Sequence, residues 1–390
     1  MSHSLPGPAA AVKLLRKMGK RRPSRALRAE EKPLALYGAG NLGMLAKGFL
    51  EKVGRKFAFV VDSAPAKAGA APAWKGVKLL KPDEVAPRDR RSHRLAVCVV
   101  TDSFSRIAGQ LRAQGWEDIV HFYDVAESYK AKYPLGNGWY SGALTRRDID
   151  ETARVLSGWG DDASRAHHLA FIAWHTLRQE LSFEGADIIP GNRFFIPQVV
   201  STLGKAPVLL DCGAHYGEVV SRFAAETGGR FGRIVAVEPD RENLRVLKAA
   251  LKKFPAAERA RIKVVEAAVG AAAGPGKFFH GLGYASKLHS KGNGTVPVRR
   301  IDDLKVPATF IKLHLEGAEL PALKGALGTI SEFRPVIAAT IYHSRDGLWK
   351  TPGYLMRKLP GYKFLLRLHN WAGTGCVVYC LPVERAARAA

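Results

Sequence analysis

The sequence predicts an α/β protein with two open, mostly parallel sheets and a helical segment between them. Twice, an apolar strand runs directly into a glycine turn and then a helix, at residues 34–43 and 208–217. Each time the next strand ends in an acidic residue, Asp62 or Glu238. This order is typical of the βαβ units of open sheets. Between the two units, from 127 to 202, the spacing of apolar residues turns helical.

Bulk composition fits this fold class. The chain has 390 residues, of which 47% are hydrophobic and 24% charged, enough for two hydrophobic cores. Its longest apolar runs, such as 95–100 and 336–341, are far shorter than the about 18–20 residues that a membrane helix needs. We therefore predict no membrane span.

The chain is strongly basic, with a formal net charge of +25. Residues 1–33 hold nine Lys and Arg residues against two Glu residues. We expect residues 1–32 to form a basic, mostly disordered tail, with room for a short helix at 10–18. The remaining positive charge is spread along the chain, so two readings stay open: an Arg-rich solvated surface, or a basic face for an anionic partner.

The four cysteines, at positions 98, 212, 376 and 380, lie mostly in apolar runs that are typical of strands. In a strand, positions 376 and 380 would be about 13 Å apart. A disulfide needs Cα atoms within about 7 Å. We therefore predict reduced core thiols and, because the first residues lack the apolar core of a secretory signal, a cytoplasmic location.

Residues 33–126 predict a small Rossmann-like domain. Its glycines have distinct expected roles: Gly38 makes the tight turn, Gly40 lets a ligand approach the backbone, and Gly43 lets helix and strand pack closely. Asp62 stands where a ribose hydroxyl would bind. Since the unit has only half the length of a full dinucleotide fold, three readings stay open: a structural domain, a nucleotide or nucleotide-sugar site, or an NAD site. The expected strands are 33–37, 57–61, 95–101 and 119–123, and the expected helices are 42–53 and 103–114.

Residues 127–202 predict a helical connector. Thr145 and Asp148 form a candidate capping box for a helix to about 157, and Asp162 is expected to cap a second helix to about 181. That second helix carries three histidines whose spacings of one, seven and eight residues differ from the spacing of four that metal-binding pairs use. We interpret these three histidines, His167, His168 and His175, as packing or surface residues. The sequence therefore predicts no metal site.

Residues 203–390 carry the candidate chemistry. The strand 208–211 ends in Asp211, and the turn that follows contains Gly213 and Gly217. Glu238 ends the next strand 27 residues later, which places it beside the glycine loop, where a carboxylate could accept the hydroxyls of a ribose. The loop is acidic and lacks the phosphate-binding GxGxxG pattern, so it favours a cationic ligand. Ribose plus cation matches S-adenosylmethionine.

Four stretches of this unit resemble the FkbM-type S-adenosylmethionine-dependent methyltransferases: Leu-Asp-Cys-Gly-Ala-His-Tyr-Gly at 210–217, Val-Glu-Pro-Asp at 237–240, Arg-Ile-Asp-Asp-Leu at 300–304 and Ile-Lys-Leu-His-Leu-Glu-Gly-Ala-Glu-Leu at 311–320. The last is similar to the family's Ile-Lys-x-Asp-x-Glu-Gly-x-Glu motif. The resemblance covers about 203–382 and implies a Rossmann-like methyltransferase sheet with a terminal antiparallel hairpin. Members with an N-terminal Rossmann-like unit share the whole architecture. The implied activity is methyl transfer to a hydroxyl of a sugar, polyketide or other small natural product.

Carried over by position, the resemblance implies a glycine loop at the methionine end of the cofactor, a ribose contact at Glu238 and an adenine wall at 266–268. In one departure, His314 stands where the family motif has Asp, which weakens any role that needs a carboxylate there. The cofactor-binding residues implied are Asp211, Gly213, Ala214, Gly217, Glu238, Asn243, Glu266 and Ala267.

Lys312, His314 and Glu316 alternate with apolar residues, so we expect them on one face of a strand. A central parallel strand is normally apolar throughout, so polar residues here indicate a site at its carboxyl end. His314 is the first candidate for the catalytic base, and His343, just past the strand 336–341, is the second. In the alternative reading, Lys312 pairs with a buried carboxylate and His314 is a core histidine.

The last segments predict a helix at 349–359 and an antiparallel hairpin of 362–368 with 376–381.

Three classes of function are compatible with these observations. The first is an O-methyltransferase acting on a hydroxylated small molecule such as a sugar or nucleotide-sugar. The second, an RNA or other nucleic-acid methyltransferase, is disfavoured because no RNA-binding module is recognisable. The third is a non-catalytic binding protein that retains the fold.

Overall fold

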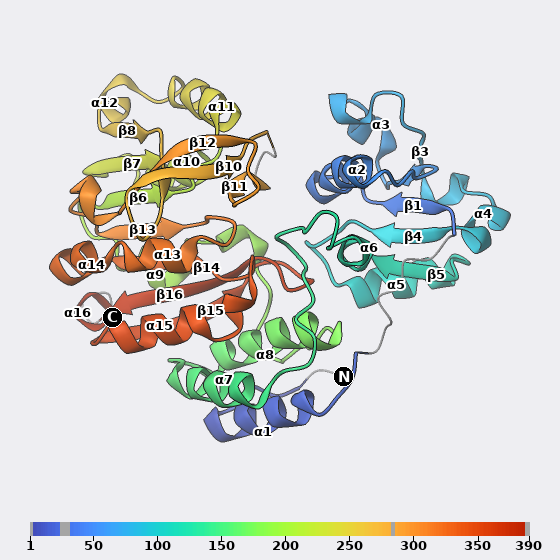
Figure 1. Ribbon diagram of the computed structural model, residues 1–390, viewed down its shortest axis with the longest axis horizontal. Coiled ribbons are helices and arrows are strands. Elements are labelled where there is room, and N and C mark those ends of the chain that lie inside the picture. The colour runs from blue at the N-terminus through green and yellow to red at the C-terminus, as the bar shows by residue number, and fades with distance from the viewer. Residues whose placement is uncertain (1–2, 24–31, 282–284, 387–390) are drawn as a thin grey trace.

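The computed structural model describes residues 3–23, 32–281 and 285–386. Two α/β units lie side by side, the N-terminal one on the right of Figure 1 and the C-terminal one on the left. Three helices, α1 (Pro8–Gly19), α7 (Arg146–Gly158) and α8 (Asp162–Leu177), lie together beneath the C-terminal unit. The mixed α/β class with parallel sheets is thus confirmed. Within the described ranges, no helix has both the length and the apolar character needed to cross a bilayer.

The N-terminal sheet is parallel throughout, in the order β3-β2-β1-β4-β5. Its four predicted strands are present but shorter than expected, and β3 was not predicted because it is a half-buried pair of residues. Apolar clusters cover both faces of the sheet. The strands are β1 (Leu34–Tyr37), β2 (Val60–Val61), β3 (Leu79–Leu80), β4 (Arg94–Val97) and β5 (Asp118–His121), and the helices are α2 (Asn41–Val53), α3 (Pro65–Gly69), α4 (Pro87–Ser92), α5 (Phe104–Ala113) and α6 (Phe122–Ser128).

Helix α1 corrects the expectation of a mostly disordered tail over 1–32. Ala11, Leu15 and Met18 recur at helical spacing and are buried against α7 and α8. The basic side chains between them face outward. The expected helix at 10–18 is therefore a docked element, and its narrow apolar stripe was masked in the sequence by the surrounding charge. Residues 24–31 of the expected tail lie outside the described residues.

The helical segment begins as predicted. Thr145 and Asp148 form the expected capping box at the start of α7. Helix α8 is capped by Asp161 rather than Asp162, and it ends at Leu177 rather than 181 because Arg178 adopts a left-handed conformation. The three histidines of α8 are buried and hydrogen-bonded to the surrounding protein, which agrees with their predicted packing role: His167, His168 and His175.

The segment is more than a connector, because it covers the C-terminal sheet. Ser164 Oγ and His167 Nδ1 on α8 accept hydrogen bonds from the backbone N–H groups of Leu366 and Leu368 in β15 (Tyr362–Leu368). Residues of α1, α7 and α8 also share one hydrophobic cluster with the sheet. The predicted boundary at 202 therefore does not separate two hydrophobic cores.

The C-terminal sheet has seven strands in the order β15-β16-β14-β13-β6-β7-β8. β16 is antiparallel to both β14 and β15, which confirms the predicted terminal hairpin. The other strands are β6 (Val208–Cys212), β7 (Arg233–Val237), β8 (Ile262–Val265), β13 (Phe310–Leu313), β14 (Val336–Thr340) and β16 (Cys376–Pro382), and the helices are α9 (Pro197–Val200), α10 (Glu218–Glu226), α11 (Arg241–Leu251), α12 (Ala256–Arg259), α13 (Glu319–Lys324), α14 (Leu327–Phe333), α15 (Lys350–Lys358) and α16 (Val383–Ala386).

A second sheet of four short strands was not predicted. Its strand order is β11-β10-β12-β9, and its strands follow β8 in the chain. Glycine and proline interrupt its strand pattern in the sequence, which hid it. Its strands are β9 (Ala268–Val269), β10 (Gly274–Phe279), β11 (Lys287–Leu288) and β12 (Gly294–Arg299).

Both faces of the main C-terminal sheet are buried. Leu209 of β6 faces one hydrophobic cluster and Leu210 the other, and Phe310 and Ile311 of β13 alternate in the same way. Such burial explains why these strands appear in the sequence as continuous apolar runs. A polar residue inside them must therefore find a partner within the protein or face a ligand.

Candidate active site

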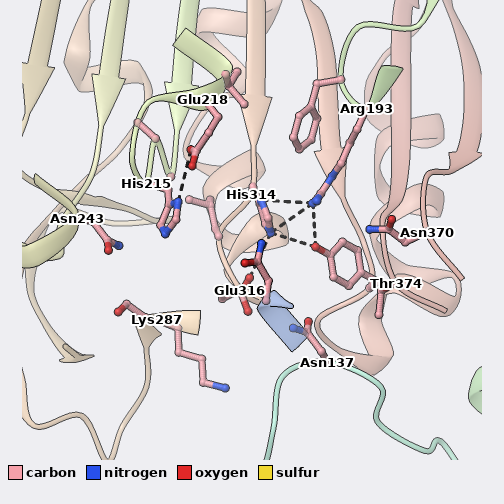
Figure 2. A pocket seen from close by; sticks show the side chains of 18 of the residues that line it. Asn137, Arg193, His215, Glu218, Asn243, Lys287, His314, Glu316, Asn370 and Thr374 are labelled. Atoms are coloured by element: carbon pink, nitrogen blue, oxygen red, sulfur yellow. Dashed lines mark hydrogen bonds and ion pairs between the residues drawn. The ribbon is translucent and has the colours of Figure 1, made fainter. Parts of the chain in front are cut away.

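A cavity of about 840 Å³ lies between the carboxyl edges of the two sheets. The glycine turn after β1 and the end of β4 form one wall, and the loops after β6, β7 and β13 form the opposite wall. Figure 2 shows side chains of the C-terminal wall, with Asn243 and His215 at the left of the view and Arg193 and Asn370 at the right. The carboxyl edge of an open α/β sheet is where such proteins bind ligands, and here two such edges share one space.

Asp211 is fully buried below the cavity wall rather than on it. Its position in β6 pairs with Lys312 of β13, and Lys312 Nζ lies 2.8 Å from Asp211 Oδ1. Nζ also donates to the carbonyl oxygen of Gly213 at 2.7 Å. The cation that meets this acidic turn is thus supplied by the protein. The structure agrees with the alternative reading of Lys312 as the partner of a buried carboxylate, in which it positions the loop.

The glycine loop itself is on the wall. Gly213 has a φ of +80°, and a Cβ there would lie 2.1 Å from the carbonyl oxygen of His314. Only glycine fits this close approach. Gly213, Ala214 and His215 line the cavity, whereas Gly217 caps α10 behind them in a left-handed conformation.

Glu238 is buried at the end of β7 and borders the cavity. Its Oε2 accepts from the backbone N–H of His215 at 2.8 Å, and its Oε1 accepts from the N–H of Asp240 at 2.9 Å and from Asn243 Nδ2 at 3.2 Å. Burial raises the pKa of Glu238, and these hydrogen bonds oppose the shift. Since a carboxylate has about four acceptor positions, about one remains for a ligand, fewer than the two that the sequence suggested.

Of the remaining predicted cofactor-binding residues, two line the cavity and one does not. Asn243 and Ala267 line the cavity. Glu266 does not: its exposed carboxylate pairs with Lys248 Nζ on the outer surface. The unpredicted second sheet adds Phe278 and Lys287 to the wall beside them, residues that no motif in the sequence singled out.

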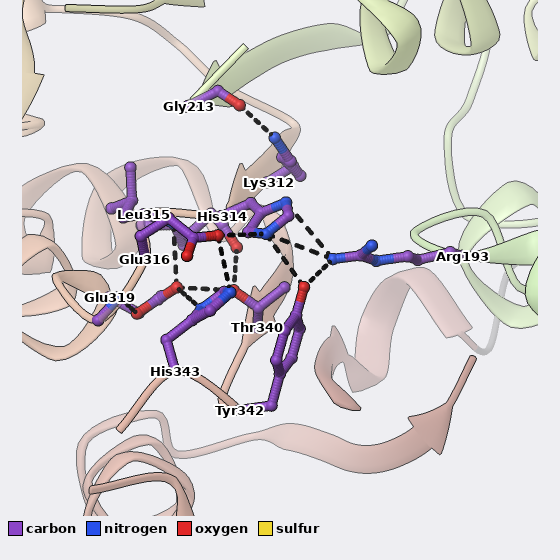
Figure 3. Close-up of polar contacts among 12 residues, drawn as sticks. Arg193, Gly213, Lys312, His314, Leu315, Glu316, Glu319, Thr340, Tyr342 and His343 are labelled. Carbon is purple, nitrogen blue, oxygen red and sulfur yellow. Dashed lines mark hydrogen bonds and ion pairs between the residues drawn. The ribbon is translucent and has the colours of Figure 1, made fainter. Parts of the chain in front are cut away.

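β13 ends at Leu313, so His314 and Glu316 lie on the loop after the strand. Glu316 has a φ of +50°, a left-handed conformation that is uncommon for a residue other than glycine, and Gly317 follows at +108°. This turn sends the Glu316 carboxylate back toward His314, whose Nε2 lies 3.2 Å from Glu316 Oε1 (Figure 3). Strained backbone of this kind is concentrated at functional sites.

His343 follows β14, and the structure brings it to the same turn. Its Nε2 lies 2.9 Å from Glu316 Oε1, and its Nδ1 lies 3.0 Å from Glu319 Oε1. Although burial alone would lower the pKa of His343, the two carboxylates raise it well above 6.5. Burial would likewise raise the pKa of Glu316, but the two imidazoles hold it below its usual range. His343 itself does not line the cavity.

His314 faces the cavity beside Arg193 and Tyr342 (Figure 3). Arg193 Nη2 donates to Tyr342 Oη at 2.8 Å and lies 3.4 Å from His314 Nδ1. Burial, and then the Arg193 guanidinium, lower the pKa of His314 to about 3. A histidine in this environment stays neutral near pH 7 and is a weaker base than the unperturbed imidazole that the sequence suggested. Arg193 and Tyr342 carried no recognisable sequence signal.

The N-terminal wall uses the predicted glycine turn. Gly38, Gly40 and Asp62 line the cavity. The carboxylate of Asp62 already accepts hydrogen bonds from the backbone N–H groups of Ala39 at 2.7 Å and Ala64 at 2.8 Å. Gly43 lies off the wall, where a Cβ would be 2.1 Å from the carbonyl oxygen of Gly38, so its role is close packing of helix and turn.

Comparisons with known proteins bear on the family and the fold. Residues 211–366 match the family model of the methyltransferase FkbM domain. The crystal structure of the methyltransferase FkbM from Methylobacillus flagellatus KT aligns with 96% of this chain and 100% of its own, at a TM-score of 0.61 and 22% identity, so both share the fold. The precorrin-6y C5,15-methyltransferase from Geobacter metallireducens GS-15 aligns with 47% of this chain and 83% of its own, at a TM-score of 0.29 and 18% identity. No curated protein matches the chain.

Proposed function

This chain carries an FkbM methyltransferase domain at residues 211–366, and on that basis we propose that it transfers the methyl group of S-adenosylmethionine to a hydroxyl group of a small molecule. One observation carries the proposal. The acidic ribose contact expected at Glu238 and the polar cluster around His314 open into the same cavity. A cofactor and an acceptor bound there would lie in one continuous space, with no part of the protein between them.

The cofactor would lie along the wall formed by β6 and β7. In this proposal Glu238 accepts a ribose hydroxyl, the backbone at Gly213 and Ala214 borders the methionine end, and Ala267 borders the adenine. Asn243 supports Glu238 through its hydrogen bond and is a positioning residue. Lys312 and Asp211 act beneath the loop by fixing its conformation.

The acceptor would approach from the side of His314 and Glu316, with His343 behind them as a positioning residue. The hydroxyl oxygen attacks the methyl carbon in line, the C–S bond breaks, and the products are a methyl ether, S-adenosylhomocysteine and a proton. Holding the two reactants in near-attack geometry supplies much of the rate enhancement in such reactions. His314, which stays neutral, can accept a hydrogen bond from the attacking hydroxyl group.

The N-terminal unit would bind the rest of the acceptor. Its wall offers backbone groups at the glycine turn together with Asn41 and Thr101, which suit a hydroxyl-rich molecule such as a sugar or nucleotide-sugar. The four cysteines are free and buried, which fits the cytoplasmic location proposed from the sequence.

The test combines calorimetry with an acceptor screen. S-adenosylmethionine should bind with one site per chain, and S-adenosylhomocysteine should compete for it. The screen should include sugars, nucleotide-sugars and RNA, with methyl transfer followed from labelled cofactor. Asn41→Ala and Thr101→Ala should raise the KM for the acceptor and leave the cofactor Kd unchanged. Absence of cofactor binding, or transfer to RNA alone, would overturn the proposal.

A further inference from the structure

Three donor side chains converge at the back of the cavity. His314, Glu316 and His343 each offer one ligand atom, and these atoms all lie within 4.8 Å of one another. Both imidazole Nε2 atoms face the same carboxylate oxygen, Glu316 Oε1, at 3.2 and 2.9 Å. From these three side chains we infer a binding site for a divalent first-row transition-metal ion with two histidine ligands and one carboxylate ligand.

The separations suit such an ion. Metal–nitrogen and metal–oxygen bonds of about 2.0–2.2 Å with angles near 90–110° place neighbouring ligand atoms about 3.0–3.5 Å apart. The two histidine–glutamate separations lie close to this range. The two rings are nearly parallel, with centroids 5.0 Å apart, so binding requires the partly exposed His314 ring to turn toward the ion. Two histidines and one carboxylate are a donor set that zinc, iron and cobalt accept.

An outer carboxylate already orients the innermost ligand. His343 Nδ1 lies 3.0 Å from Glu319 Oε1, so a proton on Nδ1 leaves the lone pair of Nε2 directed at the cluster. Glu319 is itself held by the backbone N–H groups of Leu315 and Gly317, each at 3.0 Å, and by the hydroxyl of Thr340 at 2.7 Å. A carboxylate–histidine–metal arrangement of this kind is usual in metal sites, where it fixes the tautomer and the ring.

The site is closed on one side and open on the other. His343 is buried behind the cluster, while His314 and Glu316 line the cavity. Three protein ligands with an open position are typical of catalytic rather than structural metal sites. This role rests on the proposed function and replaces the hydrogen bond from the hydroxyl to His314, whose Nε2 would hold the ion instead. A bound ion would lower the pKa of an acceptor hydroxyl at the open position, so that the hydroxyl could lose its proton to solvent before methyl transfer.

The test is metal binding by the full chain. After removal of metals with a chelator, Co²⁺ titration should show visible absorption that saturates at one ion per chain, and Zn²⁺ should abolish the signal by competition. Glu316→Gln and His343→Ala should weaken Co²⁺ binding by more than about 100-fold, and Glu319→Gln by about 10–100-fold, the effect of losing an outer partner. His314→Asp should keep a site and shift its preference toward Mn²⁺.

Controls separate this inference from folding and from the proposed function. His289→Ala, which removes a histidine outside the cluster, should leave Co²⁺ binding unchanged. Thermal unfolding identifies variants that fail to fold. Because His314 is partly exposed, His314→Ala should still fold, and it should no longer bind the ion. If the wild-type chain binds no Co²⁺, or if folded cluster variants bind it as well as the wild type, the inference is wrong. Calorimetry with S-adenosylmethionine tests the proposed function independently.

Discussion

Glu238→Gln tests the cofactor site most directly. Three protein donors already occupy the carboxylate, the N–H groups of His215 and Asp240 and the side-chain amide of Asn243. About one of its four acceptor positions remains for a ribose hydroxyl. A hydrogen bond to a charged acceptor contributes about 1.5–3 kcal/mol. The variant should therefore raise the Kd for S-adenosylmethionine by about 10–150-fold.

The glutamine also places an amide N–H₂ where the carboxylate accepted a backbone N–H, so part of the loss could come from a shifted loop. A cofactor analogue that lacks one ribose hydroxyl separates the two effects. The wild type should bind the analogue more weakly than the parent cofactor, whereas Glu238→Gln should bind both equally. In calorimetry this pair of ligands and pair of proteins forms a double-mutant cycle whose coupling term belongs to the hydrogen bond.

Glu242→Gln is the matched control. Glu242 lies nearby on α11, is exposed and pairs with Arg245 at 3.3 Å, so the variant makes the same change of charge away from the cavity. Its Kd should stay within about twofold of the wild type. An unchanged Kd in Glu238→Gln, or an equal loss in Glu242→Gln, would refute the assignment of the ribose contact.

The other predictions concern the buried pair, the helical layer, the acceptor side and the net charge. Lys312→Met strands the carboxylate of Asp211 and should lower the free energy of unfolding by about 3–5 kcal/mol, measured in urea, with much of the loss recovered by adding Asp211→Asn. Burial would raise the pKa of Asp148, but hydrogen bonds from Trp349, Thr145 and Arg345 lower it to about 2, so its stabilising effect is present above pH 4 and is lost as the pH falls toward 2. Asp148→Asn should flatten this part of a plot of unfolding free energy against pH, and an unchanged slope would contradict the reasoning. His314→Ala should slow single-turnover methyl transfer by about 10²–10⁴-fold and leave the cofactor Kd within a few fold of the wild type. If the variant keeps the wild-type rate, His314 has a packing role and no role in the reaction. RNA binding, measured by fluorescence anisotropy, should be weak and fall steeply between about 50 and 200 mM salt, and tight, salt-resistant binding would contradict it.

Much of the fold could be predicted because its central strands are buried on both faces. Such strands appear as short apolar runs, and the glycine turns and caps between them mark where helices begin. The helices 42–53 and 103–114 and the terminal hairpin were predicted for this reason. The second sheet was missed because glycine and proline interrupt its strands. The helix of α1 was expected, but its docking was missed because its apolar stripe lies within a basic segment.

The candidate site was predictable only where its residues share a strand end with a motif. Glu238 was predicted at the end of a strand and borders the cavity. His314 and Glu316 were predicted on the face of a strand, but β13 ends at Leu313 and they line the cavity from the loop that follows. Arg193 comes from an irregular segment and Lys287 from the unpredicted strand β11, and only tertiary packing brings them to the cavity. The cluster of His314, Glu316 and His343 is likewise formed by tertiary packing. From the sequence, each residue was a separate candidate, and no metal site was predicted.

The charge of the cavity bears on which acceptor class it suits. The whole chain has a net charge of +25. Yet the described residues that line the cavity include four lysines and arginines and four acidic residues, so the formal net charge of these side chains is zero. The basic charge therefore lies elsewhere on the protein and does not concentrate where methyl transfer would occur. A polyanion bound at the reaction centre would require an excess of cationic groups on these walls. A balanced wall, with backbone and amide groups on the N-terminal side, suits a small hydroxylated acceptor instead.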